Sequence, residues 1–519
     1  MSELPKGWED IELRDLVGLA HTGLVRSAKD QSDEFEFPYL KMNNLSINGR
    51  FLLDKMTKVN ATPPEVGKFT LERGDFLFNT RNSVELVGKC GVYQGSVHDQ
   101  VLFNNNLLKI KLLIVLPEII AHWFNSALGK KQLSEITSAT TSVAAIYQKA
   151  LMTRRVPVPP LAEQKRIVEK LDEVLAQVDT IKARLDGIPD LLKRFRQSVL
   201  ASAVSGKLTE EWRGSHIIES QQVDSILESR KDLWVKNEER KLREKNNSPF
   251  VKWKGKYKTP SVDPEEKFNT PDTWLNIRAD VLSFLITDGK HGDCSNDEES
   301  GYYFISAKDI FNGKINYSNA RQINSSEFRE VHFRTNLELG DVLVTNAGTI
   351  GRVAVATEEL MLSKTTFQKS VAVIKLVKNH ISSKYFALYL EAGVERLKNK
   401  SSGTAVKNLL LRDIRDMSIS LPSIAEQKEI VRLVDQYFAF ADTIEAQVKK
   451  AQARVDNLTQ SILAKAFRGE LVAQDPTDEP ADKLLERIAE ARKEAEALAK
   501  AAKKAEAAKK KAEKAAAKG

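Results

Sequence analysis

The chain contains a long internal repeat. The segment from Pro159 to Leu208 returns from Pro422 to Leu471 at a constant offset of 263 residues, without a gap, and about twenty of the fifty aligned positions are identical. Two copies of one unit in a single chain predict an object with a pseudo-two-fold axis. Such an object suits a partner that offers two half-sites or two identical subunits.

Each copy carries apolar residues at 4-3-4-3 spacing, which is the heptad register of a coiled coil. A helix of roughly 40 residues would span about 60 Å at 1.5 Å per residue, which is too long for one compact domain. We therefore expect the two helices to bury each other rather than to be unrelated surface helices. The seam residues are Ile167, Leu171, Val174, Val178, Ile181, Leu185, Leu192, Phe195 and Val199 in the first copy, and Ile430, Val434, Tyr437, Ile444, Val448, Val455, Leu458 and Ile462 in the second.

The two helices differ at one place. Asp186-Gly187-Ile188-Pro189 interrupts the first seam, whereas the second continues through Lys449-Lys450-Ala451-Gln452. Proline removes a helical hydrogen bond and its ring clashes with the preceding turn, so we expect a kink or break in the first helix.

The regions upstream of the helices repeat more faintly, at offset 266. Leu4–Trp8 corresponds to Thr270–Trp274, and Leu71–Leu77 to Leu337–Leu343. Short β-branched or aromatic runs separated by Gly, Asn and Asp predict strands. A helix is expected after them, from Pro117 to about Leu133 and from Ser382 to about Leu397. We interpret the regions as two α+β modules of about 150 residues. The predicted strands are Phe76–Phe78, Gly91–Tyr93, Leu107–Leu113, Val342–Val344, Val353–Val355 and Val371–Leu376.

Composition places the chain among ordinary cytoplasmic proteins. Cys90 and Cys294 stand in opposite halves and outside any metal-ligand spacing, so disulfides and zinc are not expected. No apolar run approaches 18 residues, and the N-terminus lacks a signal-peptide profile. The net charge is +8, but residues 481–519 hold twelve Lys or Arg against seven Asp or Glu, so the body is only mildly basic. Charge therefore permits nucleic-acid binding without establishing it.

Two segments fall outside the repeat. Residues 213–262 combine a polar, helical run from Val223 to Arg243 with a Lys- and aromatic-rich stretch, and we interpret them as a solvated linker, with contact to a phosphate backbone as the alternative. After Pro480 the chain consists of Ala, Lys, Glu and Leu, which predicts a frayed, solvated helix.

The chain lacks the motifs of common catalytic sites. There is no phosphate-binding Gly-Lys-Ser/Thr loop, no dinucleotide-type glycine turn and no Asn-Pro-Pro-aromatic tetrapeptide, and the seven histidines are scattered. Asp75 and Asp341 follow glycines at equivalent places, where a turn before a strand is the expected role. We expect no catalytic, cofactor-binding or metal-binding residues in this chain.

The order of these features resembles the specificity subunit of type I restriction-modification enzymes. The resemblance rests on the strings from Pro157 to Lys165 and Leu421 to Lys428, the Gly-Asp-x-Leu strands at Gly74 and Gly340, and the helix ends Ser205–Leu208 and Arg468–Leu471. It implies an α+β fold in which two β-rich target-recognition domains are joined by two long antiparallel coiled-coil helices. The implied division is 1–155 for the first recognition domain, 156–212 for the first spacer helix, 213–262 for the linker, 263–420 for the second recognition domain, 421–475 for the second spacer helix and 476–519 for the Lys/Ala-rich tail.

The resemblance also implies partners. Each recognition domain would read one half of a split target in double-stranded DNA, while two adenine methyltransferase subunits and motor-nuclease subunits would dock on the chain. S-adenosylmethionine, ATP and Mg²⁺ would serve those subunits, and this chain would be non-catalytic.

Base edges are read by Arg, Lys, Asn, Gln and short hydroxyl side chains, so such residues in loops beside strands are the candidate DNA contacts. A turn-forming or strand-capping role is an equal alternative for each of them. The candidates are Lys41, Asn43, Asn44, Asn79, Thr80, Arg81, Asn82, Thr140 and Thr141 in the first module, and Lys308, Thr345, Asn346, Thr349, Lys364, Thr365, Thr366 and Thr404 in the second.

Two functions of other classes stay open. A self-contained nuclease with fused specificity modules would need clustered acidic metal ligands on strands, which the sequence does not display. Within the resemblance, a specificity subunit of a related nuclease-methyltransferase system is a further alternative. A coiled-coil scaffold without a DNA role would fail to bind duplex DNA.

Overall fold

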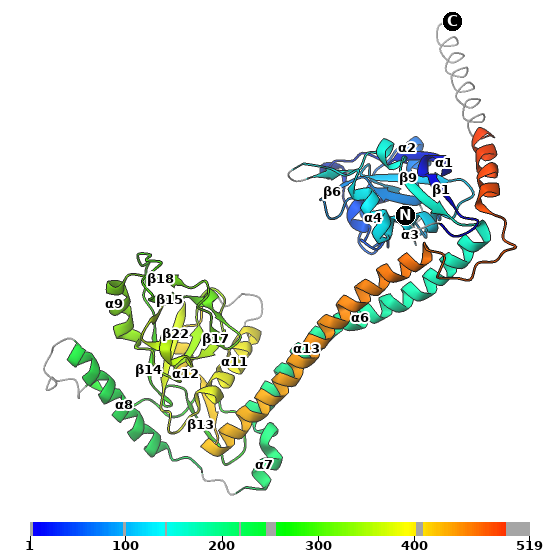
Figure 1. Cartoon of the computed structure of the whole chain (residues 1–519). Coiled ribbons are helices and arrows are strands. Elements are labelled where there is room, and N and C mark those ends of the chain that lie inside the picture. Colours follow the sequence, from blue (N-terminus) through cyan, green and yellow to red (C-terminus); the bar gives the residue numbers. More distant parts are fainter. Residues whose placement is uncertain are drawn as a thin grey trace. The chain divides into compact units, whose positions relative to one another are not determined.

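The computed structural model describes residues 4–96, 100–140, 143–216, 220–244, 256–400 and 408–494, with the backbone alone for 394–400. The chain divides into two compact units, Met1–Asp186 with Lys449–Gly519, and Gly187–Val448. Each unit contains one globular module and a part of each of two long helices (Figure 1). In the described residues no helix is long and apolar enough to cross a membrane.

The first module is built on a four-stranded antiparallel sheet, in the order β2-β9-β5-β7. A second sheet, β4-β3-β8, contains the parallel pair β3–β8, and β1 pairs with β12, the strand directly before the first long helix. The strands are β1 (Glu9–Glu12), β2 (Val17–Thr22), β3 (Phe37–Leu40), β4 (Thr57–Val59), β5 (Phe76–Asn79), β6 (Arg81–Asn82), β7 (Cys90–Val92), β8 (Leu102–Phe103), β9 (Leu107–Leu112), β10 (Ser138–Ala139), β11 (Ala144–Ala145) and β12 (Arg155–Val158); the helices are α1 (Leu13–Leu16), α2 (Pro63–Phe69), α3 (Pro117–Asn125), α4 (Ala127–Ser134) and α5 (Gln148–Leu151).

The second module repeats this topology. Its four-stranded sheet has the order β14-β22-β19-β20, a second sheet β18-β15-β21 contains the parallel pair β15–β21, and β13 pairs with β23. The strands are β13 (Leu275–Arg278), β14 (Ser283–Asp288), β15 (Tyr303–Ile305), β16 (Ile310–Phe311), β17 (Lys314–Ile315), β18 (Arg321–Gln322), β19 (Val342–Thr345), β20 (Val353–Val355), β21 (Thr365–Phe367), β22 (Val371–Leu376) and β23 (Ser418–Leu421); the helices are α9 (Ser325–Thr335), α10 (Glu359–Leu362), α11 (Ser383–Lys400) and α12 (Leu411–Asp416).

The matching sheet orders confirm that the repeat includes the modules. The six predicted strands are present as β5, β7, β9, β19, β20 and β22, with ends displaced by at most one residue. The helix predicted from Pro117 is instead two helices, α3 and α4, because Ser126 has an extended backbone and caps α4 by accepting a hydrogen bond from Gly129 N. A Cβ on Gly129 would lie 2.0 Å from the Trp123 carbonyl oxygen, so the sharp corner requires glycine.

The two long helices are α6 (Leu161–Ser205) and α13 (Ile424–Ala466), and they pack antiparallel. In the first unit Lys182 pairs with Asp456 at 2.7 Å and Gln452 donates to Asp186 at 2.7 Å. In the second unit Arg196 pairs with Asp442 at 2.6 Å. Residue numbers rise along α6 as they fall along α13, as expected for an antiparallel coiled coil.

Most of the predicted seam is buried or half-buried. Ile181, Tyr437 and Leu458 are exceptions, with 45%, 40% and 47% of their surface exposed. A pair of helices buries only one narrow stripe of each, and side chains at the edge of the stripe are covered only where a module packs against it. Tyr437 keeps one contact across the seam, an edge-to-face packing with Phe195.

The predicted break in the first helix is wrong. α6 is one continuous helix of 45 residues with Pro189 inside it. Pro189 is solvent-exposed, while Val178 and Leu192 on either side of it are buried. Tertiary packing provides most of the stability of a helix, so the loss of a backbone hydrogen bond at Pro189 does not end it.

Two further helices change the interpretation of the segments outside the repeat. α8 (Val223–Glu244) contributes the fully buried Ile226 to the core of the second module, and residues 481–494 contribute Leu484 and Ile488 to the core of the first. The solvated linker and the solvated tail that we expected are therefore wrong for these residues. The short α7 (Glu210–Gly214) connects α6 to α8.

These two helices are a further part of the repeat. Ile226, Glu228, Arg230 and Lys231 correspond to Ile488, Glu490, Arg492 and Lys493. Arg230 pairs with Asp280 and Arg492 pairs with Asp15, both at 3.3 Å. We call α8 and residues 481–494 the strap helices. Each follows a long helix and packs on a module in its own unit.

Candidate nucleic-acid interface

Two candidate residues of the first module are buried in turns. The Asn44 side-chain amide donates to the carbonyl oxygens of Leu52 at 3.0 Å and Lys55 at 3.1 Å. The Asn79 amide donates to the carbonyl oxygens of Arg81 at 3.0 Å and Asn106 at 3.1 Å. For both residues these contacts match the turn-forming alternative that the sequence left open.

Three other candidates meet on one small sheet, β10-β11-β6. In this sheet Ala145 lies opposite Arg81 and Ala144 opposite Asn82, and the turn between β10 and β11 contains Thr140. The side chains of Arg81 and Thr140 are exposed, and that of Asn82 is half-buried. The fold thus brings together residues about 60 positions apart in the sequence. Thr141 lies outside the described residues.

The remaining candidates of the first module differ in exposure. Asn43 is exposed on a single 3-10 turn, Met42–Asn44. Lys41 is half-buried and its Nζ donates to Gln31 Oε1 at 2.9 Å. Thr80 is half-buried and its hydroxyl donates to the Asn106 carbonyl oxygen at 3.0 Å.

In the second module four candidates are buried. The Thr345 hydroxyl donates to the Thr349 carbonyl oxygen, and the Thr365 hydroxyl donates to the Met361 carbonyl oxygen at 2.7 Å. Asn346 Oδ1 and Thr366 Oγ1 are buried and have no hydrogen-bond partner in the part of the chain that the structure describes. In this conformation Thr345, Thr365 and Thr366 have no exposed surface to offer to DNA.

Lys308, Thr349 and Lys364 are the exposed candidates of the second module, and Thr404 lies outside the described residues. Ala347 forms an isolated antiparallel β-bridge with Asn408. In the first module Arg81 pairs with Ala145 in the same antiparallel sense. Ala347 stands at the repeat position of Arg81, 266 residues later. The two modules therefore present different side chains from the same place in one fold.

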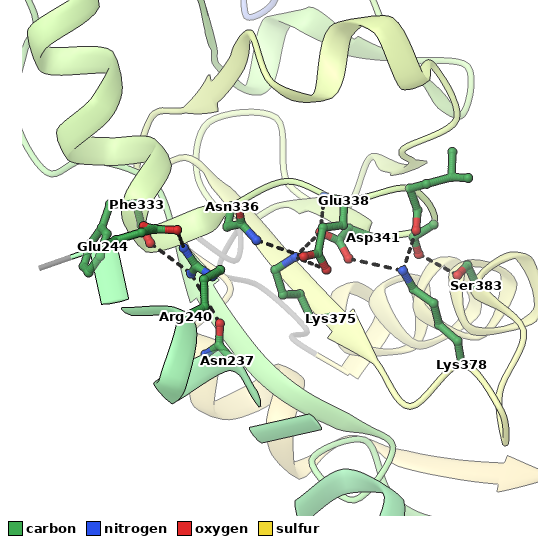
Figure 2. A network of polar contacts seen from close by, with 12 residues as sticks. Asn237, Arg240, Glu244, Phe333, Asn336, Glu338, Asp341, Lys375, Lys378 and Ser383 are labelled. Atoms are coloured by element: carbon green, nitrogen blue, oxygen red, sulfur yellow. Dashed lines mark hydrogen bonds and ion pairs between the residues drawn. The ribbon is translucent and has the colours of Figure 1, made fainter. Parts of the chain in front are cut away.

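Each module contains a buried ion pair that the sequence did not predict. Lys109 on β9 lies 3.0 Å from Asp75. Lys375 on β22 lies 2.7 Å from Asp341, as Figure 2 shows for the second module. Both aspartates also accept a backbone hydrogen bond across the turn before the strand, which confirms the predicted turn. Burial raises the pKa of Asp341 to about 6, opposed by the Lys375 ammonium.

Each pair ties together two strands of the central sheet of its module. Each joins the turn at the start of β5 or β19 to the neighbouring strand, and β5 and β19 lead directly to Arg81 and Thr345. The sequence carries a signal for these pairs: each has a lysine inside a largely apolar strand, and the two lysines are 266 residues apart, as are the two aspartates.

No group of three His, Cys, Asp or Glu side chains that could hold a metal ion occurs among the described residues. A groove in the first unit runs between the module and its two long helices, and its walls mix acidic and basic side chains. Arg50 of the module forms an ion pair with Asp179 of α6 across this groove.

Comparison with known proteins identifies the family. Residues 5–190 and 290–452 match the type I restriction modification DNA specificity domain. The chain is 31% identical to the EcoKI specificity subunit of Escherichia coli K12, over 94% of this chain and 96% of that protein. It is 35% identical to the EcoBI specificity subunit of Escherichia coli, over 69% of each chain.

A solved structure described as the structural basis of complex assembly and conformational transition of the type I R-M system has a similar fold. Its TM-score is 0.60 at 18% identity, and the match covers 91% of this chain and 100% of that one.

Proposed function

The chain belongs to the specificity subunits of type I restriction-modification systems, the non-catalytic DNA-recognition components, and from this premise we propose that it reads a bipartite DNA target with one module for each half-site. The observation that carries the proposal is the duplicated module. Both copies have the same sheet order and separate cores, but they expose different side chains at equivalent positions. One fold used twice with different surfaces suits two different half-sites.

Reading in the first module is assigned to the sheet β10-β11-β6. An arginine can donate two hydrogen bonds to guanine in the major groove, and this groove admits a β-ribbon as well as a helix. Arg81 and Thr140 are exposed together on such a ribbon. In the second module the exposed Lys308, Thr349 and Lys364 are the corresponding candidates.

We propose that two adenine methyltransferase subunits and motor-nuclease subunits dock on this chain. The repeat of module and long helix offers two equivalent docking faces to two copies of one subunit. Each methyltransferase would bring S-adenosylmethionine to an adenine flipped out of its half-site. ATP and Mg²⁺ would serve the motor-nuclease. The alternative of a scaffold without a DNA role predicts no sequence-dependent binding to duplex DNA, and the alternative of a fused nuclease predicts cleavage by the pure chain with Mg²⁺.

Mapping of methylated adenines in cells that carry the chain with its methyltransferase tests the proposal. A split sequence with a fixed gap is expected. Arg81→Ala should relax the bases of one half-site, by about 1–3 kcal/mol of discrimination for a lost bidentate contact, and leave the other half unchanged.

Arg73→Ala is the matched control, because Arg73 is also exposed in the first module but precedes β5, whereas Arg81 follows it. Equal relaxation of both half-sites by Arg81→Ala would contradict reading by separate modules. An unsplit target, or none, would refute the proposed function itself.

A further inference from the structure

The same three residues connect module to long helix in both units. They are a tryptophan near the start of the module and a Glu-Gln pair in the first turn of the long helix: Trp8, Glu163 and Gln164 in the first unit, and Trp274, Glu426 and Gln427 in the second. All six side chains are buried. We call each set a joint.

The glutamate of each joint holds the amino-terminal end of its module. The Trp8 indole N–H donates to Glu163 Oε2 at 2.9 Å, and the Trp274 indole N–H donates to Glu426 Oε2 at 2.9 Å. Each tryptophan stands just before the strand that pairs with the last strand of the module. The contact thus attaches the edge of the module to the long helix.

The glutamine of each joint holds a second part of the module. Gln164 Oε1 accepts from Leu116 N at 3.0 Å, directly before α3, and its amide donates to the Pro159 carbonyl oxygen at 2.8 Å. Gln427 Oε1 accepts from Ser382 N at 2.7 Å, directly before α11, and its amide donates to the Pro422 carbonyl oxygen at 3.0 Å.

The apolar residues Ile167 and Leu171 of α6, and Ile430 and Val434 of α13, pack into the core of the adjoining module. The joint adds directional hydrogen bonds at separate points, which fix the angle of the helix more narrowly than non-directional packing does. The contacts are buried, so removing one partner leaves a polar group unsatisfied at a cost of about 1–3 kcal/mol. The lever is long. A helix of 45 residues spans about 68 Å at 1.5 Å per residue, so a change of about 5° at its first turn moves its far end by about 6 Å. That displacement is close to two base-pair steps of about 3.4 Å.

We propose that the two joints are positioning elements that set the gap between the half-sites, by fixing the direction in which each long helix leaves its module. This inference rests on the proposed bipartite reading. It makes the six joint residues determinants of spacing that touch no DNA base.

The joints are not equally restrained. Glu426 also accepts from Thr209 at 2.7 Å and from Arg213 at 2.5 Å, and the Arg213 guanidinium lies over the Trp274 ring at 5.8 Å. Glu163 has no such contact with an arginine among the described residues, since Arg166 pairs with Asp478 at 2.6 Å. Arg166 acts on Glu163 only through its charge, and the Gln474 side chain also acts on this carboxylate. Replacing glutamate by glutamine keeps the acceptor for tryptophan in both joints but removes an ion pair only from the second.

The experiment measures binding of the chain, assembled with its methyltransferase, to a series of duplexes in which the gap varies one base pair at a time. Gln164→Leu and Gln427→Leu should shift or broaden the preferred gap, with at least a fivefold loss at the wild-type gap and no change in the bases read. Glu426→Gln should broaden the gap, whereas Glu163→Gln should leave it unchanged. Gln177→Leu and Gln447→Leu, at exposed positions of α6 and α13, are controls that should behave as wild type.

The outcomes separate the two proposals. If the wild-type complex prefers no gap at all, the bipartite function fails. If it prefers one gap and the joint variants, although less stable to heat, keep that gap as sharply as wild type, the joints are merely structural and this inference is overturned. Should a Gln→Leu variant fail to fold, Trp8→Phe and Trp274→Phe, which keep an aromatic ring but lose the N–H donor and part of the buried indole, decide in the same assay.

Discussion

The strap helices allow each unit to be destabilised separately. Ile488 and Ile226 occupy equivalent positions in the two straps and are 2% and 0% exposed. Ile488→Ala removes apolar atoms from the core that contains Trp8, Leu108 and Ile110, and Ile226→Ala does the same in the core that contains Trp274, Val344 and Ile374. Truncation of a buried isoleucine to alanine costs about 2–5 kcal/mol, because the lost transfer free energy adds to the free energy of the cavity.

A loss of about 3 kcal/mol raises the population of the opened unit by about two powers of ten. Hydrogen exchange measures this directly for amides that exchange only when their unit opens. In Ile488→Ala the amides of β5 and β9 should exchange about a hundredfold faster, while those of β19 and β22 keep their wild-type rates. Ile226→Ala should give the reverse pattern.

Glu490→Ala and Glu228→Ala are the matched controls, because both glutamates are exposed on the same helices. If Ile488→Ala left β5 and β9 protected, the strap at 481–494 would not be part of the first core. If it accelerated exchange in both units alike, the chain would open as one cooperative body and the division into two units would be wrong.

Three further predictions concern the buried charges and the long helices. Lys375→Met should destabilise the second unit by about 3–5 kcal/mol in denaturant unfolding, because it leaves Asp341 buried beside only the more distant Lys378. Lys364→Met is the control and should be near neutral, because Lys364 is exposed. Equal effects of the two substitutions would refute the role of the pair. Burial raises the pKa of Glu163, opposed by the Trp8 hydrogen bond, so its folded form holds a proton more tightly than the unfolded chain and the stability of wild type falls as pH rises through that raised pKa. Glu163→Gln, which does not titrate, should therefore gain stability relative to wild type as pH rises from about 4 to 7, and a constant difference would contradict this sign. Insertion of seven residues after Lys450 lengthens α13 alone by about 10 Å while it keeps the heptad register. Methylation mapping should then show a changed gap between the half-sites, or no methylation. The original gap at full efficiency would mean that the helices do not set the spacing.

Much of the architecture followed from local patterns. The heptad spacing from Ile167 to Val199 and from Ile430 to Ile462 predicted two long paired helices, and β-branched runs such as Val371–Leu376 predicted the central strands. These patterns are reliable because a helix and a strand each repeat their burial at a fixed period. The strings at Pro157–Lys165 and Leu421–Lys428 resembled the specificity subunits of type I restriction-modification enzymes, and the family comparison confirms that resemblance.

Local patterns failed where the outcome depended on distant partners. Asp186–Pro189 has the composition of a helix break, yet packing on both sides of it keeps α6 continuous. Residues 481–494 look like solvated helix because charged residues dominate them, but Leu484 and Ile488 fall on one face and pack into the core of the first module. The string shared around Arg230 and Arg492 indicates this helix, and it lies just beyond the ungapped repeat of residues 159–208 and 422–471.

For the candidate interface, the sequence by itself determined that polar residues gather in loops after the central strands of two copies of one module. Only the tertiary structure decided which of them face solvent. Thr345, Thr365 and Thr366 have the same chemistry as Thr140, but the first three are buried, whereas Thr140 is exposed directly after β10 of the sheet that also carries Arg81. The reason is physical: a hydroxyl or amide can satisfy its hydrogen bonds equally well inside a turn or with an external partner, and the choice depends on which residues fold above it.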